Sequence, residues 1–506
     1  MNPCSRALTG CPAVIGLFVA AVASAANAAP PAKPNVIFIM ADDLGWTDLG
    51  CQGSRYYETP YIDRLATQGM RLTCHHHCQN CTPTRAALMS GQVGARTGVY
   101  TVGAIDRFDW SMRPLAPVEN LTSLPLDRDT IANQLKAAGY STGMFGKWHI
   151  GEKGDHHPAR RGFDEAIVSM GKHYKFTTNP PVDHPSDEYL ADFLTARAVD
   201  FIRRHKDGPF FLYLPHFGVH SPFQAKPEFV ARFEGKPPVG GHHDPTYAAM
   251  IASVDESVGR VMQTLDDLGL ATNTVVMFTS DNGGVGGYGR PDGLIREPGR
   301  DLGATKKGNA PGEDGKGVTD NSPLRSGKGS LYEGGIRVPF IVRWPGVVKP
   351  GSASDVPTIH VDVFPTLLEI AAAPAPRQPL DGASLVGLFR DPSTTLGREA
   401  IFQHFPGYLG AGTGLWRTTP VSLVHAGDWK LMEFLEDGRL ELYNLRDDVG
   451  ETKNLADSMP AKAKELHGRL AAWRAEVKAP LPKPNRPHDA KPTEKRASKF
   501  RQEAAR

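Results

Sequence analysis

The chain has 506 residues, with 57 Lys and Arg against 55 Asp and Glu, a formal net charge of +2 and a hydrophobic fraction of 40%. This hydrophobic fraction allows a sizeable core and excludes global disorder. The balanced charge argues against a nucleic-acid-binding protein, which would carry a basic surplus. Glycine and proline together make up about one residue in five, which predicts long structured loops of the kind that carry sites.

The first 28 residues have the pattern of an export signal. Arg6 lies in a short n-region, residues 13–23 form an apolar run, and Ala26-Asn27-Ala28 fits a cleavage site of small residues. The run is shorter than a membrane-spanning helix requires, and no later segment approaches 18 apolar residues. We therefore expect a signal peptide over 1–28 and an exported chain, periplasmic or secreted, without stable membrane insertion. The alternative is an anchor that is retained.

Short apolar runs alternate with helix-like segments along the first half of the mature chain. The runs suit strands buried on both faces of a parallel sheet. The alternation predicts an α/β fold with a large, mostly parallel or mixed sheet flanked by helices, whose ligands lie beyond the carboxyl ends of the strands. The predicted strands are 35–40, 140–145, 210–214 and 275–278, and the predicted helices are 61–68, 130–138, 189–205 and 247–268.

The pattern changes in the last quarter of the chain. Residues 429–435 and 439–443 flank Asp437-Gly438, which predicts a hairpin with a type I′ turn. An amphipathic helix follows, with Leu466, Leu470, Trp473 and Val477 on one face. We expect a catalytic domain over 29–395, a smaller C-terminal α+β subdomain with an antiparallel sheet and a helix over 396–480, and a disordered basic, Pro-rich tail over 481–506. Residues 283–327 are predicted to form a long loop.

The densest motif begins at Cys81, which is followed by Pro83, Arg85 and Ser90-Gly91. This pattern resembles the signature of the sulfatase family, in the arylsulfatase-like branch of the alkaline phosphatase superfamily. In that family the cysteine is oxidised to formylglycine (3-oxoalanine), and the hydrated aldehyde is the nucleophile. The resemblance implies a sulfuric ester hydrolase with an alkaline-phosphatase-like fold, and a formylglycine-generating enzyme as a partner during maturation. Further segments that match the family are Asp42-Asp43 and residues 146–149, 218–222, 280–284 and 327–339.

Four polar residues follow two of the predicted strands. Carboxylate and amide oxygens are hard ligands, which suit Ca²⁺ or Mg²⁺ rather than zinc. The resemblance implies a divalent cation, Ca²⁺ with Mg²⁺ as the alternative, that orients the sulfate group. The predicted metal ligands are Asp42, Asp43, Asp281, Asn282 and the residue derived from Cys81.

The remaining catalytic roles are implied by the same resemblance. Arg85 lies one helical turn from Cys81, so it can face the same pocket, where it would orient the formylglycine hydrate. Lys147 and Lys328 would bind sulfate oxygens. His220, together with Lys328, would protonate the leaving oxygen. His149 would remove a proton from the hemiacetal sulfate and so regenerate the aldehyde.

Removal of the signal leaves four cysteines, all within the first hundred residues. Cys51, Cys74 and Cys78 allow one disulfide, with the pairing left open. The triplet His75-His76-His77 lies between two of these cysteines. We expect it to form a polar loop beside the pocket, where one histidine could contact substrate; zinc binding is the alternative.

The expected substrate is a sulfate monoester on a glycan or sugar sulfate, because the predicted pocket loops contain His, Trp, Arg and Tyr. Two alternatives stand beside this prediction. One is a phosphate or phosphonate monoester hydrolase of the same superfamily, which would share the metal acids and the fold. The other is a non-catalytic protein that binds sulfated glycans, for which the intact nucleophile motif would be unnecessary.

Overall fold

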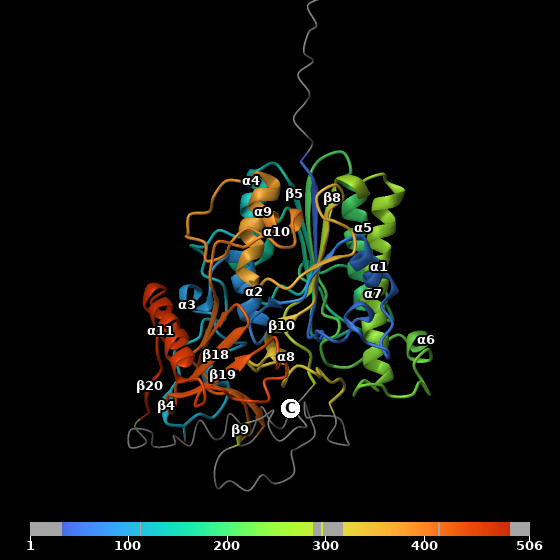
Figure 1. The fold of residues 1–506 in the computed structure, drawn as a ribbon. Helices are drawn as coiled ribbons and strands as arrows, with labels where there is room; N and C mark the ends of the chain where they lie inside the picture. Colours follow the sequence, from blue (N-terminus) through green and yellow to red (C-terminus); the bar gives the residue numbers. More distant parts are fainter. Residues whose placement is uncertain (1–32, 112, 287–294, 297–316, 413–414, 486–506) are drawn as a thin grey trace, which may run out of the picture. The chain divides into compact units, whose positions relative to one another are not determined.

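A computed structural model describes residues 33–111, 113–286, 295–296, 317–412 and 415–485. These residues belong to one compact unit, whose main body is a central sheet with helices on both faces (Figure 1). The predicted signal peptide and most of the predicted tail lie outside the described residues. Among the described residues, no helix combines the length and the apolar character that crossing a membrane requires.

The central sheet has eight strands in the order β12-β2-β11-β8-β1-β7-β5-β6. All neighbouring pairs are parallel except those of β11, which runs antiparallel to both β8 and β2. The prediction of a large, mostly parallel sheet is therefore confirmed. The strands are β1 (Asn35–Ala41), β2 (Met70–Leu72), β5 (Ser141–Gly146), β6 (Glu165–Val168), β7 (Phe210–Pro215), β8 (Thr274–Ser280), β11 (Phe340–Arg343) and β12 (Ser352–Ser354).

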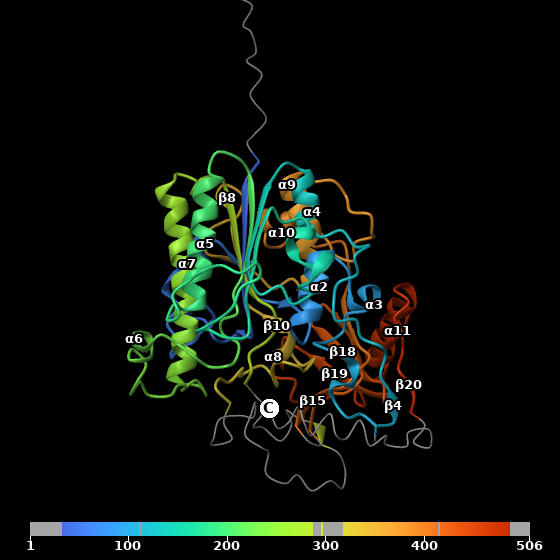
Figure 2. The same ribbon diagram turned by 180° about the vertical axis from the view of Figure 1, so that it is seen from behind.

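Two layers of helices cover the two faces of this sheet, as Figures 1 and 2 show from opposite sides. Strands β1, β7 and β8 are buried along their whole length, which explains why their sequences are continuous apolar runs. One face packs against α1 (Pro60–Gln68), α5 (Leu190–Arg204) and α7 (Pro245–Asp267). The other packs against α2 (Cys81–Ser90), α4 (Ile131–Ala137), α9 (Val363–Ala371) and α10 (Val386–Arg390).

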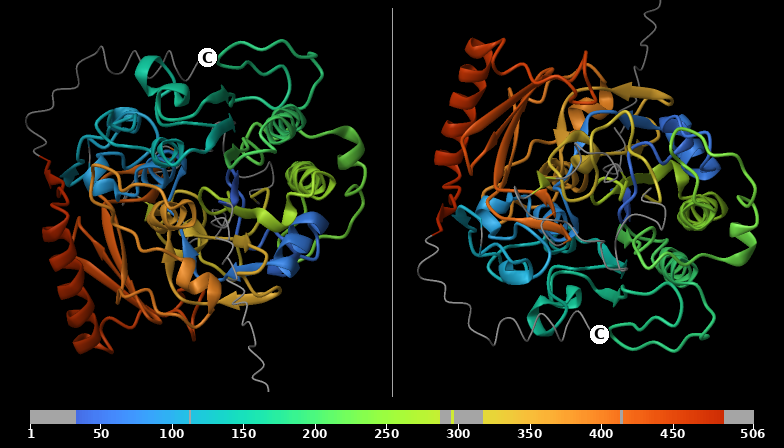
Figure 3. Two further views of the ribbon diagram at one scale, coloured as in Figure 1. Left: turned by 90° about the horizontal axis from the view of Figure 1, so that it is seen from above. Right: turned by 90° about the horizontal axis from the view of Figure 1, so that it is seen from below.

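A second sheet, antiparallel and four-stranded, is built from the C-terminal part of the chain in the order β14-β17-β18-β19. Helix α11 (Pro460–Glu476) lies along it (Figure 3) and buries Leu466 and Leu470 against it. Trp473 stacks on Phe402 at 5.0 Å between ring centroids. The smaller C-terminal α+β part is thus present. Its strands are β14 (Ile401–Phe405), β17 (Val421–Ala426), β18 (Trp429–Phe434) and β19 (Arg439–Asn444).

The hairpin between β18 and β19 differs from the prediction in its turn. Phe434 pairs with Arg439, so the loop has four residues instead of the two of a type I′ turn. Only Gly438 in this loop has a positive φ, of 72°. Asp437 accepts a hydrogen bond from the backbone N–H of Arg439 at 3.0 Å, and this local bond favours the wider turn.

Several short strands lie outside the central sheet and the C-terminal antiparallel sheet. In a three-stranded sheet, β3 (His75–His76) lies between β10 (Arg337–Val338) and β13 (Thr358–Ile359). The described end of the predicted disordered tail is ordered instead: β20 (Lys483–Pro484) pairs with β4 (Leu115–Ala116). Within the predicted loop 283–327, β9 (Ile295–Arg296) pairs with β16 (Leu415–Thr418), whose other neighbour is β15 (Leu409–Gly412).

The remaining helices are single turns: α3 (Gly94–Thr97), α6 (Pro227–Val230) and α8 (Glu333–Ile336). Of these, α8 matters most for the site, because it lies in the 327–339 segment and carries Glu333. The described cysteines, Cys51, Cys74, Cys78 and Cys81, are all free thiols, so the disulfide that the sequence allowed among the first three is absent from the described residues.

Candidate active site

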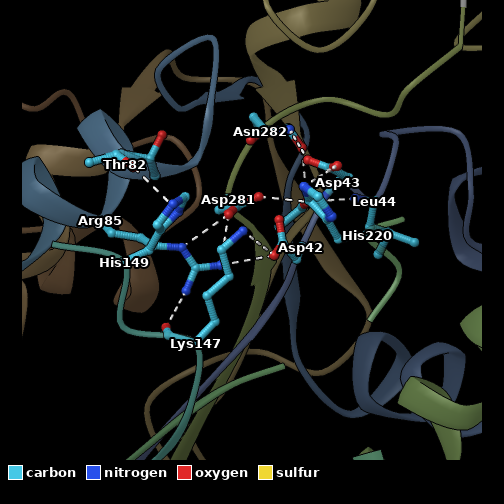
Figure 4. A network of polar contacts seen from close by, with 12 residues as sticks. Asp42, Asp43, Leu44, Thr82, Arg85, Lys147, His149, His220, Asp281 and Asn282 are labelled. Atoms are coloured by element: carbon cyan, nitrogen blue, oxygen red, sulfur yellow. Dashed lines mark hydrogen bonds and ion pairs between the residues drawn. The ribbon is translucent and has the colours of Figure 1, made fainter. Parts of the chain in front are cut away.

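Two acidic segments meet where two neighbouring strands end. Asp42-Asp43 follows β1 and Asp281-Asn282 follows β8, and these strands are paired in parallel up to Ala41 and Ser280. The Asp281 backbone N–H donates to the carbonyl of Ala41 at 3.0 Å, and the Asp43 N–H donates to Asp281 Oδ1 at 3.2 Å. All four side chains are at most 1% exposed. The parallel register therefore places both segments in one buried cluster (Figure 4).

The acidic cluster has the composition of a divalent cation site. One ligand atom each from Asp42, Asp43, Cys81 and His220 lie within 4.8 Å of one another. Asp42 Oδ1 and Asn282 Oδ1 are buried and have no hydrogen-bond partner among the described residues. Buried oxygen atoms without a donor are costly unless a cation or water meets them. The donor set therefore fits a hard cation such as Ca²⁺ or Mg²⁺.

Three cationic side chains surround these carboxylates. Arg85 donates from Nε and Nη2 to Asp281 Oδ2 at 3.1 and 2.7 Å. Lys147 Nζ lies 2.5 Å from Asp42 Oδ2, and Lys328 Nζ lies 2.7 Å from Asp43 Oδ2. Each aspartate thus has one close cationic partner, and Arg85 Nη2 also lies 3.8 Å from Asp42 Oδ2. A divalent ion added to this balanced set leaves a positive surplus, which suits an anionic group such as a sulfate ester.

The carboxylates titrate differently because their surroundings differ. Burial and the nearby Asp281 raise the pKa of Asp42 to about 7. Burial also opposes ionisation of Asp43, but Lys328, His220 and Lys147 hold its pKa below the ordinary value. Burial opposes ionisation of Asp281 as well, and Arg85 outweighs it, so the pKa of Asp281 is lowered. Nearby positive charge keeps two of the three acids ionised.

Cys81 is the first residue of α2 and is 1% exposed. Burial raises the pKa of its thiol to about 12, although Lys147 and Lys328 oppose the rise. The unmodified side chain is therefore a thiol and a poor nucleophile at neutral pH. Arg85 lies one turn further along α2 and reaches the same cluster, donating also to the Lys147 carbonyl.

The two predicted histidines approach the cluster from separate loops. His220 Nδ1 donates to the Ser221 carbonyl at 2.6 Å, which leaves Nε2 facing Asp43 Oδ2 at 3.7 Å. His149 Nδ1 lies 3.3 Å from Thr82 Oγ1 on α2. Burial and Lys328 lower the pKa of His220 to about 3, and burial with Lys147 holds the pKa of His149 well below its ordinary value. Both rings are therefore neutral.

Backbone strain accompanies two of these side chains. Asp43 and His149 have φ values of 65° and 61°, in the left-handed region that non-glycine residues rarely occupy. Asp43 lies two residues beyond the end of β1, and His149 lies three residues beyond the end of β5. Such strain persists only where surrounding contacts impose it, and it turns both side chains toward the cluster.

A cavity of about 350 Å³ opens beside His149. Its lining is mainly polar or charged, so it can accept a hydrated ligand group next to the cluster. Among its residues, only His149 was predicted as a site residue. Glu152 and Lys153 were missed, although their closeness to His149 in sequence was a usable signal. The lining residues are Thr122, Ser123, His149, Gly151, Glu152, Lys153 and His156.

One expectation about the pocket was wrong: His75 and His76 form strand β3 instead of part of a polar loop, and all three histidines of the triplet are at most 1% exposed. A side chain that supports the loop carrying Asp43 was also not predicted from the sequence. Tyr247 on α7 donates to Asp48 Oδ2 at 2.7 Å and to the Asp43 carbonyl at 3.2 Å. No local pattern marks these two residues, because only the folding of α7 against the β1 loop brings them together.

Comparisons with known proteins identify the family of this chain. The sulfatase family profile matches residues 34–373, and the profile of the C-terminal region of N-sulphoglucosamine sulphohydrolase matches residues 327–476. A sulfatase of Formosa agariphila is 34% identical, over 88% of this chain and 90% of its own length. The steryl-sulfatase of Rattus norvegicus is 31% identical, over 84% of this chain and 81% of its own.

Solved structures show the same similarity. Ps i-CgsB in complex with k-i-k-neocarrahexaose has a TM-score of 0.70 at 27% identity, covering 87% of this chain and 92% of its own. A second similar structure is a Bacteroides thetaiotaomicron protein from a locus for metabolism of multiple glycosaminoglycans. It has a TM-score of 0.65 at 27% identity, and the match covers 88% of this chain and 99% of that protein's chain. With the family profile matching most of the chain, this protein belongs to the sulfatase family and is a sulfuric ester hydrolase.

Proposed function

We propose that this chain is an exported sulfatase that removes a sulfate monoester from a glycan or sugar sulfate. In this proposal it uses a formylglycine hydrate derived from Cys81 and a bound divalent cation, Ca²⁺ in preference to Mg²⁺. The observation that carries the proposal is the single buried cluster in which Cys81, three aspartates and three cationic side chains meet.

The cation would be held by oxygens of Asp42, Asp43, Asp281 and Asn282, with the residue derived from Cys81 as a further ligand. When bound, it supplies a positive centre that orients the sulfate group and stabilises developing negative charge. The unmet Oδ1 atoms of Asp42 and Asn282 support this assignment. Ca²⁺ is preferred because the set mixes carboxylates and an amide without strict octahedral demands.

The nucleophile would be a hydroxyl of the formylglycine hydrate at position 81. Arg85 reaches position 81 along α2 and is fixed by Asp281, so it can orient that hydroxyl. Lys147 and Lys328 lie on two sides of the carboxylates and would bind the sulfate oxygens as the charge on them grows. Pre-positioned charges of this kind lower the barrier without reorganising during the reaction.

Proton transfer would fall to the two histidines and a lysine. His220 Nε2 and Lys328 Nζ both face Asp43 Oδ2. Burial opposes the charge on Lys328, but Asp43 holds its pKa above the ordinary value, so the pair can deliver the lysine proton to the leaving oxygen. His149 lies on the α2 side through its contact with Thr82, where a neutral imidazole can accept the proton released when the aldehyde is regenerated. The two proton-transfer sites are thus on different sides of the cluster.

A glycan substrate is supported by two observations. The cavity beside His149 is lined by hydroxyl, carboxylate, ammonium and imidazole groups, which match the hydrogen-bonding pattern of a sugar. A similar structure, that of Ps i-CgsB, holds k-i-k-neocarrahexaose. Export is supported by the composition of residues 1–28, and maturation would require a formylglycine-generating enzyme. N-terminal sequencing of the secreted or periplasmic protein should place the mature start near residue 29.

The chemistry is tested by mass spectrometry of the peptide that contains Cys81, taken from protein made in its native source. We expect the mass that results when the –CH₂SH group is replaced by an aldehyde or its hydrate. A Cys81→Ser variant should bind sulfated sugars but lose turnover. An unmodified peptide in fully active native protein would refute the proposed nucleophile.

The substrate is tested with a panel of sulfated mono- and disaccharides, aryl sulfates and matched phosphate esters. We expect the highest kcat/KM for a sulfated sugar and far lower values for the phosphates. Fast hydrolysis of aryl sulfates with no turnover of any sulfated sugar would refute the glycan assignment. Preference for the phosphate esters would favour a phosphate or phosphonate monoester hydrolase.

A further inference from the structure

A second cluster of metal-binding side chains lies outside the acidic cluster. Cys74, His76 and His425 each offer a ligand atom, and these atoms lie within 4.8 Å of one another. All three residues are buried, with exposed fractions of 7%, 1% and 2%. Cys74 precedes β3, His76 belongs to β3, and His425 belongs to β17 of the C-terminal sheet. The cluster therefore joins segments that are far apart in the sequence.

The two imidazoles have nitrogen atoms left for a ligand. His76 Nε2 lies 3.0 Å from Glu333 Oε2, and because a carboxylate only accepts, Nε2 carries the hydrogen. This leaves His76 Nδ1 with a lone pair. His76 Nδ1 and His425 Nδ1 are both buried and have no hydrogen-bond partner among the described residues. Two buried ring nitrogens without hydrogen-bond partners in one cluster suggest that a metal ion binds there.

The surroundings of His76 have the form that supports metal-bound imidazoles. In such sites the nitrogen opposite the metal usually donates to a carboxylate, which fixes the ring. Here Glu333 is itself held by Lys430, whose Nζ lies 2.9 Å from its Oε1. Lys430 also contacts Glu451 at 2.8 Å, so its charge is balanced by two carboxylates. The orientation of His76 is thus set before any ion binds.

The neighbouring histidines differ in part, because His75 has partners on both ring nitrogens, whereas His77 and His360 are paired through Nε2 and also have a buried Nδ1 without a partner among the described residues. His75 Nε2 lies 2.9 Å from His77 Nε2, and His75 Nδ1 lies 2.8 Å from Thr358 Oγ1. Cys78 Sγ lies 3.5 Å from His360 Nε2. These neighbouring sulfur and imidazole side chains are also buried, so variants of them provide controls for the Cys74, His76 and His425 cluster.

We propose that Cys74, His76 and His425 bind a structural Zn²⁺ ion, with water in the fourth position of its tetrahedron. One thiolate and two imidazoles suit zinc, whereas the acidic cluster offers mainly oxygen. Binding releases the thiol proton to solvent and involves no redox change. The ion ties β17 to β3, the strand that precedes Cys81 and α2, and so links the C-terminal sheet to the catalytic segment.

The first test measures zinc in full-length protein produced with added zinc, in a Cys81→Ser background. This background removes the thiol of the acidic cluster, so thiolate-bound metal must come from elsewhere. We expect about one zinc per chain, reduced at least tenfold by Cys74→Ala or His425→Gln. The matched control Cys78→Ala should keep its zinc. An Asp42→Asn substitution should also keep it, because the proposed site does not depend on sulfatase chemistry.

The second test replaces zinc with Co²⁺ during expression and records the thiolate-to-cobalt charge-transfer band. We expect the band in the Cys81→Ser and Cys78→Ala proteins and its loss in Cys74→Ala and His425→Gln. Where a variant fails to fold, anomalous scattering at the zinc edge from crystals of the Cys81→Ser protein decides the matter. Zinc absent from protein grown with zinc, or a band that disappears with Cys78 instead of Cys74, would overturn the proposal.

Discussion

At the scale of single residues, the acidic cluster depends on matched charges. Three buried aspartates face two buried cations, Arg85 and Lys147, and the partly buried Lys328, and each pair has at least one contact of 2.7 Å or less. A buried ion pair contributes little when intact, but loss of one partner leaves a charge that water cannot reach. Substitutions here should therefore affect stability and turnover together.

Arg85→Lys keeps the charge but removes the forked contact with Asp281. We expect kcat/KM to fall about 100-fold or more, because a pre-positioned donor is lost from the site. Unfolding in urea should show a loss of about 1–3 kcal/mol. Arg204→Lys is the control, since Arg204 pairs with Glu165 on the surface and should change neither quantity measurably. Wild-type activity in Arg85→Lys would contradict the role given to Arg85.

The Tyr247→Phe substitution tests whether the hydrogen bonds of Tyr247 support the strained backbone at Asp43. The phenol donates to the Asp48 carboxylate and the Asp43 carbonyl, so its removal frees the loop that carries Asp43. We expect a loss of about 1–2 kcal/mol in unfolding free energy, as for a buried hydrogen bond. Affinity for the divalent cation, measured by calorimetry, should also fall. Unchanged cation affinity would mean that Asp43 is positioned by its strand alone.

At the scale of elements, several helices are held by residues from other elements. Asp255 on α7 accepts from the backbone N–H groups of Tyr61 and Ile62 at 3.1 and 2.7 Å, and so caps the start of α1. The residue before α1, Thr59, makes no side-chain cap of its own. The helix therefore depends on a tertiary contact for its N-terminal donors.

This cap predicts a pH-dependent stability. Burial raises the pKa of Asp255 from 3.8 to about 7, so the native state binds a proton more tightly than the unfolded chain. The contribution is fully present below about pH 4 and is lost as the pH rises through about 7. Relative to Asp255→Asn, the wild type should lose up to about 4 kcal/mol of unfolding free energy over this range. Urea titrations at several pH values test this; parallel curves for the two proteins would contradict it.

Helix α11 tests how the C-terminal sheet is covered. Leu470 is fully buried between α11 and the sheet, so Leu470→Ala should cost about 2–5 kcal/mol through lost burial and the cavity left behind. Lys464→Ala on the exposed side of the same helix should stay within about 0.5 kcal/mol. Thermal unfolding followed by circular dichroism separates the two. Equal effects would mean that the helix does not pack as described.

At the scale of the whole molecule, the acidic cluster ties together strand ends and loops from residue 42 to residue 328. A ligand bound only by the folded chain therefore stabilises the entire fold. At a free Ca²⁺ concentration of about 100 times Kd, the unfolding free energy should rise by about 2.7 kcal/mol over chelated protein. Differential scanning calorimetry, with Mg²⁺ and Ca²⁺ compared, measures the effect.

The Asp42→Asn variant is the control for this measurement, because it removes one carboxylate oxygen of the proposed ligand set. Its unfolding should respond to added Ca²⁺ much less than that of the wild type. Activity should fall on chelation and return with the cation that gives the larger thermal shift. A wild-type midpoint that chelation leaves unchanged would argue against a bound divalent cation at the acidic cluster.

Much of the fold and of the acidic cluster could be predicted because the signals are local. Continuous apolar runs predict the buried strands, and strands that run in parallel must bring their carboxyl ends to one edge, where Asp42 and Asp281 meet. The Cys81 and Arg85 spacing likewise follows from one helical turn. The four-residue turn at 435–438 was missed because Asp437 accepts a hydrogen bond from the backbone N–H of Arg439, and the Asp-Gly pair in the sequence does not predict this bond.

The amino-acid sequence alone thus determined the fold class and the family, and it predicted a reactive cysteine with neighbouring acids, because these signals lie in adjacent residues or in strand periodicity. Only the tertiary structure decided that the histidine triplet is buried, that Tyr247 supports Asp43, and that His425 meets Cys74. These contacts join residues separated by up to several hundred positions. No periodicity links such residues, since their meeting depends on how whole layers pack.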